Sequence, residues 1–411
     1  MRSERLAMLQ PVSTWTGYSG PPNPRILIVG EAWGADEEKM RLPFVGVSGQ
    51  ELWRMLGEAF PDIRPDLHAN AAELCDPRWG LAWVPRRSDW LAAAGIGMTN
   101  ILNMRPPNNK LDAICAGKSE MDKEYWKDYS YAALTSTHKY LRKEHLHHLD
   151  RFKEQVNELR PNLIVAMGNT ACWGTLGHTG INAIRGTTTL SPQGVKVLPT
   201  LHPASLLYEG QWSNRPIVVI DLMKAAREGA FPEIRRPPRT INIFPSEEEV
   251  EQFVEETIAN KPWRMGVDTE TSGGMIDTIG FARNEREAFV VPFGPHRFKR
   301  GDNYVIIKPR RNGEDVTNYW SFEEECRVWK LLKRLLEAKI DLVFQNGVYD
   351  IQYLLRMTIR PDRCRDDTML AWHSLFPELR KSLGFIGSML TDESAWKELS
   401  RHKADTARRD K

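Results

Sequence analysis

Short apolar runs alternate with amphipathic stretches through the N-terminal half of the chain. Strands are predicted where such a run ends in a glycine or a polar residue, at 25–29, 96–102, 163–167 and 195–201. Between the second and third runs, apolar residues recur at helical spacing and predict a helix over about 141–159. Alternating strands and helices predict a largely parallel sheet, whose ligands gather beyond the carboxyl ends of the strands.

A proline-rich stretch separates this pattern from a second one. Residues 231–245 contain four prolines, which predicts a linker. Ser246 and Glu249 then form a capping box that begins a helix extending to about residue 259. Further strands are predicted at 265–269, 278–282 and 288–292, and helices at 323–338, 348–356 and 366–376. Consecutive strands predict a partly antiparallel sheet, so we expect two α/β domains, at 1–230 and 246–411.

Composition limits the class of protein without choosing the function. A content of 41% hydrophobic and 27% charged residues is typical of a soluble globular protein. No run of about 18 apolar residues predicts a membrane span, and the N-terminus lacks the apolar core of a signal peptide. We therefore expect a cytoplasmic protein without a membrane partner. The net charge of +2 does not decide on nucleic-acid binding, because a DNA enzyme can confine its basic surface to one groove.

Five short motifs occur in the first domain, and GEAWG, TN and HPAS among them lie at or just after predicted strand ends. Taken singly, each is more typical of a turn, a cap or a core position than of a functional site. Taken in this order, they resemble the uracil-DNA glycosylase superfamily, and within it the family 4 group, over about residues 20–230. The motifs are GEAWG…PFVG at 30–46, TNILNMRPPNN at 99–109, MGN at 167–169, IRG at 184–186 and HPAS at 202–205.

The resemblance implies a parallel-sheet α/β/α domain with a pocket for a base that has left the DNA stack. Phe44 matches the position that stacks on the base, and Asn100 the position whose amide binds its Watson–Crick edge. His202 matches the donor that stabilises negative charge on the departing base. Glu31 is the candidate that positions or deprotonates the attacking water. Backbone amides of the loop that begins at Gly30 would hold base or phosphate oxygens.

Several positions of the first domain depart from the family pattern or leave a role open. Asp36 and Glu37 are alternatives for activating the water, and Trp33 replaces a usual proline where it can reshape the pocket floor. Family 4 enzymes hold an iron–sulfur cluster with four cysteines. Here Asn103 and Met104 stand where one of them is expected, and the five cysteines of the chain are scattered without a CxxC pair. We therefore expect reduced thiols and no cofactor for this domain.

A second set of motifs follows the linker. In DTET, Asp268 and Glu270 are two residues apart on a strand and so point the same way. In FQNGVYD, Asn346 and Asp350 are four apart at a helix start and so share a face. With DDTMLAWH at 366–373, this order resembles the 3′→5′ exonuclease domain of family-A, phage-type DNA polymerases over about residues 262–395. The resemblance implies a mixed-sheet, RNase H-like fold.

The same resemblance implies a metal site. Asp268, Glu270 and Asp350 match the ligands of two Mg²⁺ or Mn²⁺ ions, one of which activates water while the other stabilises the leaving 3′ oxygen. Asn346 and Asp367 match positions that touch the substrate or support the ligands.

The family also has a further motif downstream, in which Asp follows an aromatic residue or His by four positions. His402 and Asp405 are the nearest candidates and are only three apart. The exonuclease domain is therefore expected to be incomplete at its C-terminus, completed by another chain, or inactive.

Three functional hypotheses remain open, all with DNA as the partner. The first is a DNA repair and replication enzyme that excises uracil by N-glycosidic hydrolysis and trims 3′ ends. The second is a non-catalytic accessory module that binds uracil or primer ends and recruits a DNA polymerase chain. The third is a nuclease that keeps a glycosylase-like scaffold only for docking. For a phage-encoded protein, the compartment would be the cytoplasm of the bacterial host.

Overall fold

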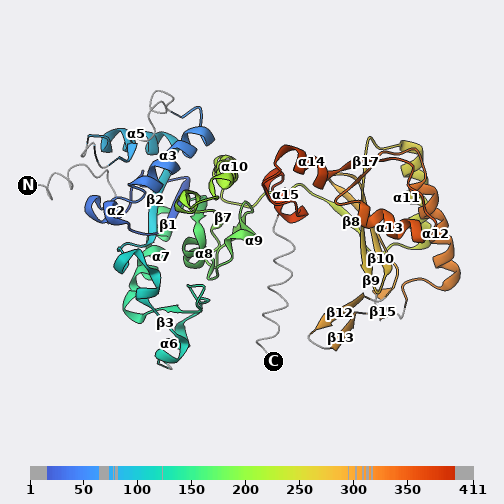
Figure 1. Cartoon of the computed structure of the whole chain (residues 1–411), viewed down its shortest axis with the longest axis horizontal. Coiled ribbons are helices and arrows are strands. Elements are labelled where there is room, and N and C mark those ends of the chain that lie inside the picture. Colours follow the sequence, from blue (N-terminus) through green and yellow to red (C-terminus); the bar gives the residue numbers. More distant parts are fainter. Residues whose placement is uncertain are drawn as a thin grey trace, which may run out of the picture. The chain divides into compact units, whose positions relative to one another are not determined.

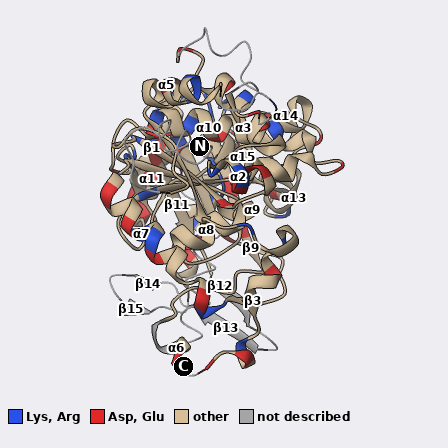
Figure 2. Ribbon diagram, turned by 90° about the vertical axis from the view of Figure 1, so that its left-hand side faces the viewer, with Lys and Arg blue, Asp and Glu red and all other residues tan. Residues whose placement is uncertain are grey.

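A computed structural model describes residues 16–63, 74–76, 78, 82–122, 124–294, 296–300, 303–307, 310–311, 314–315 and 318–393. The chain divides into two compact units (Figure 1). The first unit consists of Met1–Arg235 with Gly384–Lys411, and the second unit consists of Arg236–Leu383. Basic and acidic residues are interspersed along the ribbon (Figure 2), in keeping with a net charge of +2. No helix in the described ranges is long and apolar enough to cross a membrane.

The first unit is built on a five-stranded sheet. Its strand order is β2-β1-β5-β7-β6, and only the edge strand β6 runs antiparallel to its neighbour. The four predicted strands and their parallel arrangement are confirmed. Two strands have the predicted bounds, and the ends of the other two differ by one to three residues. The strands are β1 (Ile26–Ala32), β2 (Ile96–Leu102), β5 (Leu163–Met167), β6 (Thr189–Leu190) and β7 (Lys196–Thr200).

Helices cover both faces of this sheet. In β1, Ile26 and Ile28 pack with α3 (Val47–Ala59), α5 (Val84–Ala94) and α10 (Arg215–Glu228). The alternate residues Leu27 and Val29 pack with α7 (His147–Leu159) and α8 (Gly168–Leu176) on the opposite face. Successive side chains of a strand point to opposite faces, so a strand covered on both sides must be apolar throughout. The predicted α/β/α class of this domain is therefore confirmed.

The segment between β2 and α7 differs from the prediction. The helix expected from about residue 141 begins only at His147, because Leu141 pairs with Cys115 in a short two-stranded sheet. The remaining elements of the unit are short. They are α2 (Ala35–Met40), η3 (Pro107–Asn109), η4 (Leu111–Ile114), β3 (Cys115–Ala116), η5 (Lys118–Glu120), α6 (Tyr125–Asp128), β4 (Tyr140–Leu141), η6 (Lys143–His145), α9 (Ile181–Ile184), η7 (Pro203–Leu207) and η8 (Trp212–Asn214).

The second unit has a six-stranded mixed sheet with the order β17-β16-β9-β10-β11-β8. Strands β9, β10 and β11 are antiparallel, whereas β16, β17 and β8 each run parallel to a neighbour. The mixed sheet is as predicted, but β8 lies inside the predicted linker because Ile241 pairs with Ala288. The strands are β8 (Thr240–Asn242), β9 (Met265–Ser272), β10 (Met275–Asn284), β11 (Glu287–Pro292), β16 (Leu342–Phe344) and β17 (Cys364–Asp367).

Three helices of the second unit begin within one residue of the predicted start, whereas the helix expected from 366 begins at Thr368, because Asp366 and Asp367 belong to β17. Ser246 accepts a hydrogen bond from the amide of Glu249 at 3.3 Å, and the carboxylate of Glu249 returns one at 2.7 Å, which confirms the capping box. Ser321 caps the next helix in the same way. The helices are α11 (Glu247–Asn260), α12 (Phe322–Leu336), α13 (Val348–Arg356) and α14 (Thr368–Leu375), with two hairpins formed by β12 (His296–Arg300), β13 (Asn303–Ile307), β14 (Arg310–Arg311) and β15 (Glu314–Asp315).

The end of the chain returns to the first unit. Sequence patterning assigned everything from 246 to 411 to the second domain. In the structure, the part of helix α15 (Leu383–Leu390) from Gly384 onward belongs to the first unit. Its buried Ser388 accepts a hydrogen bond from Arg185 at 2.9 Å. The second unit is therefore inserted between two stretches of the first.

Candidate active site

The carboxyl ends of the parallel strands bring the motifs of the first unit to one edge of the sheet. Gly30 at the end of β1 is in register with Asn100 in β2. Met167 is in register with Thr200, so Gly168 and His202 follow neighbouring strand ends. Residues from four separate motifs thus gather where a parallel sheet binds its ligands.

Gly30 is packed closely against two of the candidate residues. A Cβ atom at this position would lie 2.9 Å from Cζ of Phe44 and would collide with Oδ1 of Asn100. Real Cβ atoms do not approach other atoms so closely, so any other residue would displace the Phe44 ring or the Asn100 amide. Glycine is required here because of this close approach and not because of a left-handed backbone.

Asn100 presents a buried amide nitrogen, Nδ2, that lacks a partner in the described part of the chain. Its residue is 2% exposed, and its backbone oxygen accepts a hydrogen bond from Arg151 at 2.6 Å. Its Nδ2 is buried and finds no hydrogen-bond partner among the described residues. A buried unpaired donor costs about 1–3 kcal/mol, so such groups are rare outside sites where a ligand completes the bond. Asn100 is thus a donor that is ready for a ligand acceptor.

Phe44 stands in an unusual backbone conformation. Its φ is 53°, in the left-handed region that bulky side chains avoid. Its N–H donates to the carboxylate of Glu37, and its C=O accepts from Arg87 at 3.5 Å. Arg87 also donates to the neighbouring carbonyl of Pro43 at 2.6 Å. These contacts clamp the loop, and strain held in this way is typical of functional sites.

Two charged residues hold the Phe44 loop from inside the protein. Both oxygens of Glu37 accept backbone N–H groups, that of Gly34 at 2.6 Å and that of Phe44. Glu37 is 8% exposed and thus organises the loop, so its alternative role as the water-activating group does not fit. Arg87 is fully buried on α5, where burial lowers its pKa to about 10. Sequence analysis missed Arg87, because a single arginine in an amphipathic helix gives no sign of burial.

His202 is arranged as a neutral donor. Its Nδ1 accepts a hydrogen bond from the backbone N–H of Ala204 at 3.2 Å, which places the proton of the neutral ring on Nε2. Burial lowers the pKa of the imidazole to about 4, so the ring is neutral at pH 7. The ring lies 6.2 Å from the ring of Phe44, with an angle of 25° between the planes. Nε2–H is therefore the donor of this neutral ring.

Glu31, the candidate for activating the water, directly follows Gly30 in the chain. Its Oε2 accepts a hydrogen bond from Thr170 at 2.6 Å. Burial raises the pKa of this carboxyl, and the bond from Thr170 partly offsets the shift. Thr170 is a second residue that sequence analysis missed, since it follows the MGN motif without a distinguishing pattern of its own.

Asp36 and Trp33 lie in the same loop but have other surroundings. The side chain of Asp36 is 41% exposed and lies 4.0 Å from the ammonium of Lys39. The backbone N–H of Trp33 donates to Met104 at 3.0 Å, which anchors the loop to the segment after β2. The indole Nε1 of Trp33 is buried and has no partner within the described part of the chain.

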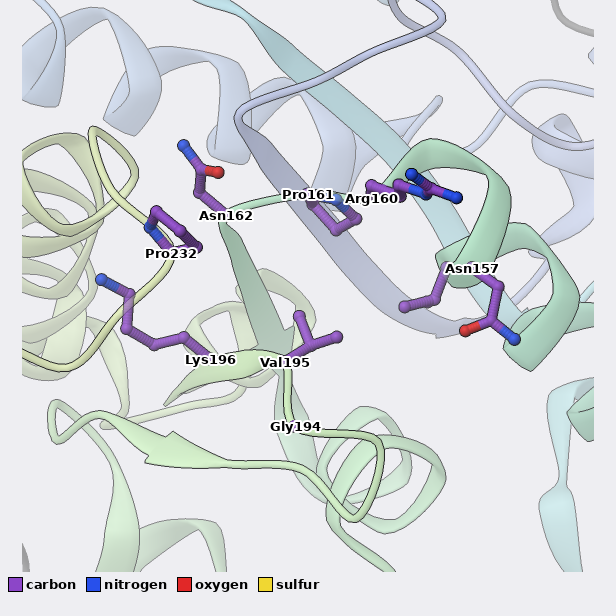
Figure 3. Close-up of a pocket in the computed structure, with 9 residues that line it drawn as sticks. Asn157, Arg160, Pro161, Asn162, Gly194, Val195, Lys196 and Pro232 are labelled. Carbon is purple, nitrogen blue, oxygen red and sulfur yellow. The ribbon is translucent and has the colours of Figure 1, made fainter.

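A hollow of about 450 Å³ lies at the opposite edge of the same sheet (Figure 3). Pro161 and Asn162 precede the first residue of β5, and Lys196 begins β7. Because these strands are parallel, their amino ends lie away from His202 and Gly168. This hollow is therefore separate from the candidate active site.

The three acidic residues predicted as metal ligands in the second unit do not share one face. Asp268 and Glu270 lie on the exposed side of β9, whereas Thr269 between them is buried. Asp350 is 3% exposed and accepts hydrogen bonds from the N–H and the hydroxyl of Thr269, at 2.8 and 2.7 Å. Within the described ranges, no group of three or more His, Cys, Asp or Glu side chains is close enough to hold a metal ion.

Asp367 and Asn346 have structural contacts in this arrangement. Asp367 caps α14 through the amide of Met369 at 2.9 Å and accepts the amides of Asn346 and Gly347 at 3.1 and 2.7 Å. Partial burial opposes ionisation of Asp367, but its backbone N–H donors outweigh this effect and lower its pKa. His402 and Asp405, the candidates for a downstream motif, lie outside the described residues.

All five cysteines fall within the described ranges and are free thiols. Cys75, Cys115 and Cys172 are buried, and Cys326 and Cys364 are exposed. Burial raises the pKa of Cys75 and of Cys172 to about 12, so both are protonated thiols at neutral pH.

Known proteins resemble the first unit in sequence. Residues 17–220 match the Uracil DNA glycosylase superfamily. The Type-4 uracil-DNA glycosylase of Thermotoga maritima is 27% identical over 208 residues, which cover 49% of this chain and 76% of that protein. Among solved structures, the Aedes aegypti Nibbler EXO domain covers 38% of this chain and 71% of its own, with 11% identity and a TM-score of 0.25. A TM-score that low carries no argument about fold or function. Residues 17–220, just under half of the chain, are therefore similar to the uracil-DNA glycosylase superfamily.

Proposed function

We propose that the first unit excises uracil from DNA by hydrolysing the N-glycosidic bond. One observation carries the proposal. The buried Nδ2 of Asn100 lacks a partner among the described residues, and the Asn100 amide and the Phe44 ring both lie directly beside Gly30. An unpaired amide beside an aromatic ring is what a flipped pyrimidine needs, because the ring stacks on the base and the amide binds its edge.

Binding uses the Phe44 ring and the Asn100 amide. The Phe44 ring stacks on the extruded base, and Nδ2 of Asn100 donates to a carbonyl of uracil. Cytosine presents an amino group at that position, so two donors would face each other and the base would be rejected. The clamp formed by Glu37 and Arg87 keeps Phe44 in its strained conformation before the base arrives, which reduces the entropy lost on binding.

Catalysis uses His202 and Glu31. A water molecule adds its oxygen to C1′ of the deoxyribose while the C1′–N1 bond breaks, and the bonding electrons leave with the base. The Nε2–H of neutral His202 stabilises the negative charge that develops on a carbonyl oxygen of uracil. Glu31, in its ionised form, orients the water and takes its proton. The base leaves as the uracil anion and then takes up a proton from Glu31 or from solvent, so the products are uracil and an abasic site.

The surface beside His202 suits contact with a DNA strand. Leu207, Tyr208 and Trp212 follow the HPAS motif and are 46, 71 and 53% exposed. Exposed apolar side chains next to a base pocket can fill the gap that a flipped base leaves in the stack. We propose that this segment supports the extruded conformation of the substrate.

The test is an excision assay on the full chain. A 5′-labelled oligonucleotide with a single uracil is incubated with enzyme, and abasic sites are revealed by alkaline cleavage. Asn100→Ala should abolish excision, whereas Asn157→Ala, at the opposite edge of the sheet, should not change it. The absence of abasic product from the unsubstituted chain at micromolar concentration would refute the proposal.

A second candidate function is uracil binding without turnover, as an accessory module for a polymerase chain. The burial that raises the pKa of Glu31 favours this alternative, because a protonated carboxyl cannot accept a proton from water. Tight binding of uracil-containing DNA without release of uracil, from pH 6 to pH 9, would support it.

For the second unit, the carboxylates present do not fit a two-metal nuclease site. Asp350 is bonded to the amide and hydroxyl of Thr269, while Asp268 and Glu270 lie on the exposed side of β9. We therefore derive no metal-dependent step from this arrangement. We propose that the second unit binds DNA 3′ ends as an accessory of the first, and electrophoretic binding of recessed and blunt duplexes to the full chain tests this role.

A further inference from the structure

We infer that the C-terminal helix α15 is a strap of the glycosylase unit that holds His202 in place through Arg185 and Asp221. The superfamily match ends at residue 220, so this helix is an addition to the matched domain. The effect on excision rests on the proposed function, but the positioning itself does not, because it is a property of the fold.

Helix α15 is bonded to the rest of the unit at a buried ion pair. Arg185 and Asp221 are 3% and 0% exposed. Nε of Arg185 donates to Oδ2 of Asp221 at 3.0 Å, and its NH2 donates to Oδ1, which makes a bidentate pair. The remaining NH1 of Arg185 donates to Ser388 Oγ of α15 at 2.9 Å. Bidentate pairing fixes the guanidinium plane, so α15 is joined to a rigid group.

The same ion pair is also bonded to β7, the strand that precedes His202. Thr200, the last residue of β7, donates through its hydroxyl to Oδ2 of Asp221 at 2.7 Å. Gly186, next to Arg185, donates its N–H to the carbonyl of Pro199 at 2.8 Å. Thr200 is two residues before His202, so the position of Asp221 determines where the strand ends and the His202 loop begins.

A buried lysine makes the first unit depend on α15. Lys224 is 3% exposed, and its ammonium donates to Gly186 O at 3.1 Å and to the carbonyls of Ser388 and Thr391 at 2.5 Å each. Two of these three acceptors belong to the C-terminal segment. Removing α15 would leave a buried ammonium with one of them, which is costly in a low-dielectric interior.

Apolar contacts complete the docking of the helix. Ile386 and Met389 are 6 and 3% exposed, and the Phe385 ring lies 5.4 Å from the guanidinium carbon of Arg185. Leu390, on the same helix, is 68% exposed. The helix is thus buried over residues 386–389 and exposed at its last residue, which supplies a matched pair of test positions.

The experiment compares Ser388→Arg with Leu390→Arg in the full chain. Ser388→Arg brings a third cation against Arg185 and Lys224 and releases α15, whereas Leu390→Arg adds the same charge at the exposed position. Hydrogen exchange should rise at residues 386–389 and also at 200–204 in Ser388→Arg alone. The kcat for uracil excision should fall by about 10- to 100-fold in Ser388→Arg with little change in KM, because a small displacement of a catalytic group mainly lowers kcat.

Thr200→Val tests the hydrogen bond between β7 and Asp221 and leaves the contacts of α15 unchanged. It removes only the hydroxyl that bonds Asp221, so kcat should fall by about tenfold while hydrogen exchange at 386–389 stays as in the unsubstituted chain. This variant also decides the matter if Ser388→Arg does not fold.

Three results would overturn the inference. They are unchanged exchange at 200–204 when α15 is released, an unchanged kcat in Thr200→Val, and equal effects of Ser388→Arg and Leu390→Arg. A chain that excises no uracil at all would refute the proposed function instead, and the exchange measurements would still decide whether α15 holds the His202 loop.

Discussion

The imidazole of His202 lies nearly parallel to the ring of Phe44, with ring centroids 6.2 Å apart and an angle of 25° between the planes. The two residues come from motifs at opposite ends of the matched segment, and the parallel sheet brings them together. A group that lies against Phe44 is therefore next to the one neutral imidazole donor of this site. In the proposed reaction, the stacking group and the charge-stabilising group are therefore neighbours.

Replacing the stacking ring should weaken substrate binding. Phe44→Ala removes a base–aromatic stack worth about 1–3 kcal/mol, so KM for a uracil-containing single strand should rise roughly 5- to 150-fold. Phe322→Ala, at a site 78% exposed in the second unit, is the matched control and should leave KM unchanged. Steady-state kinetics measures both. An unchanged KM in Phe44→Ala would show that the base does not lie on this ring.

Excision should depend on pH through Glu31 and not through His202. The pKa of Glu31 is raised by burial above 4.5, and the ionised form is needed to accept a proton, so the rate falls as pH drops through that raised value. His202 has a pKa of about 4 and stays neutral throughout, so it contributes no inflection near 6.5. Single-turnover rates from pH 4.5 to 9 should show one acid limb.

A Glu31→Gln variant separates the two groups. It should lower the rate by about 10²- to 10⁴-fold and abolish the acid limb, because the amide does not titrate in this range. A limb that persists unchanged in Glu31→Gln would assign the titration to another residue.

The buried Arg87 should act on the Phe44 loop. Arg87→Met leaves the carbonyls of Pro43 and Phe44 without this donor, so the protein should lose about 1–3 kcal/mol of stability. KM should rise as well, because Phe44 then leaves its strained conformation. Arg86→Met, at the exposed neighbouring position, is the control. Thermal unfolding and excision kinetics measure the two effects, and Arg87→Met kinetics equal to those of Arg86→Met would contradict this role.

Chelation of divalent metals should leave uracil excision unchanged. The groups gathered at the first site are an amide, an aromatic ring, an imidazole and a single carboxylate, and the proposed step uses no metal ion. We also expect Mg²⁺ to add no trimming of 3′ ends, since Asp350 is bonded to Thr269 and does not join Asp268 and Glu270. Gel analysis with EDTA or Mg²⁺ tests both points. Mg²⁺-dependent trimming that is lost in Asp268→Asn would contradict the second.

Much of the fold was predictable from local pattern. The strands at 26–32 and 163–167 are apolar on both faces because helices cover both sides of the sheet. The capping box at Ser246 was also visible, since its two hydrogen bonds join residues three positions apart. The placement of Gly30, Asn100 and His202 at one edge follows from the parallel order of their strands.

The sequence by itself thus determined the strands, the caps and the edge at which the motifs meet, because these depend on residues close together in the chain. Only the tertiary structure decided that Arg87 is buried under Phe44, that Thr170 bonds Glu31, and that Asp350 turns to Thr269. It also decided that Ser388 returns to Arg185, across 203 positions of the chain. Such contacts join segments whose local patterns carry no information about each other, so they are settled only when the chain packs.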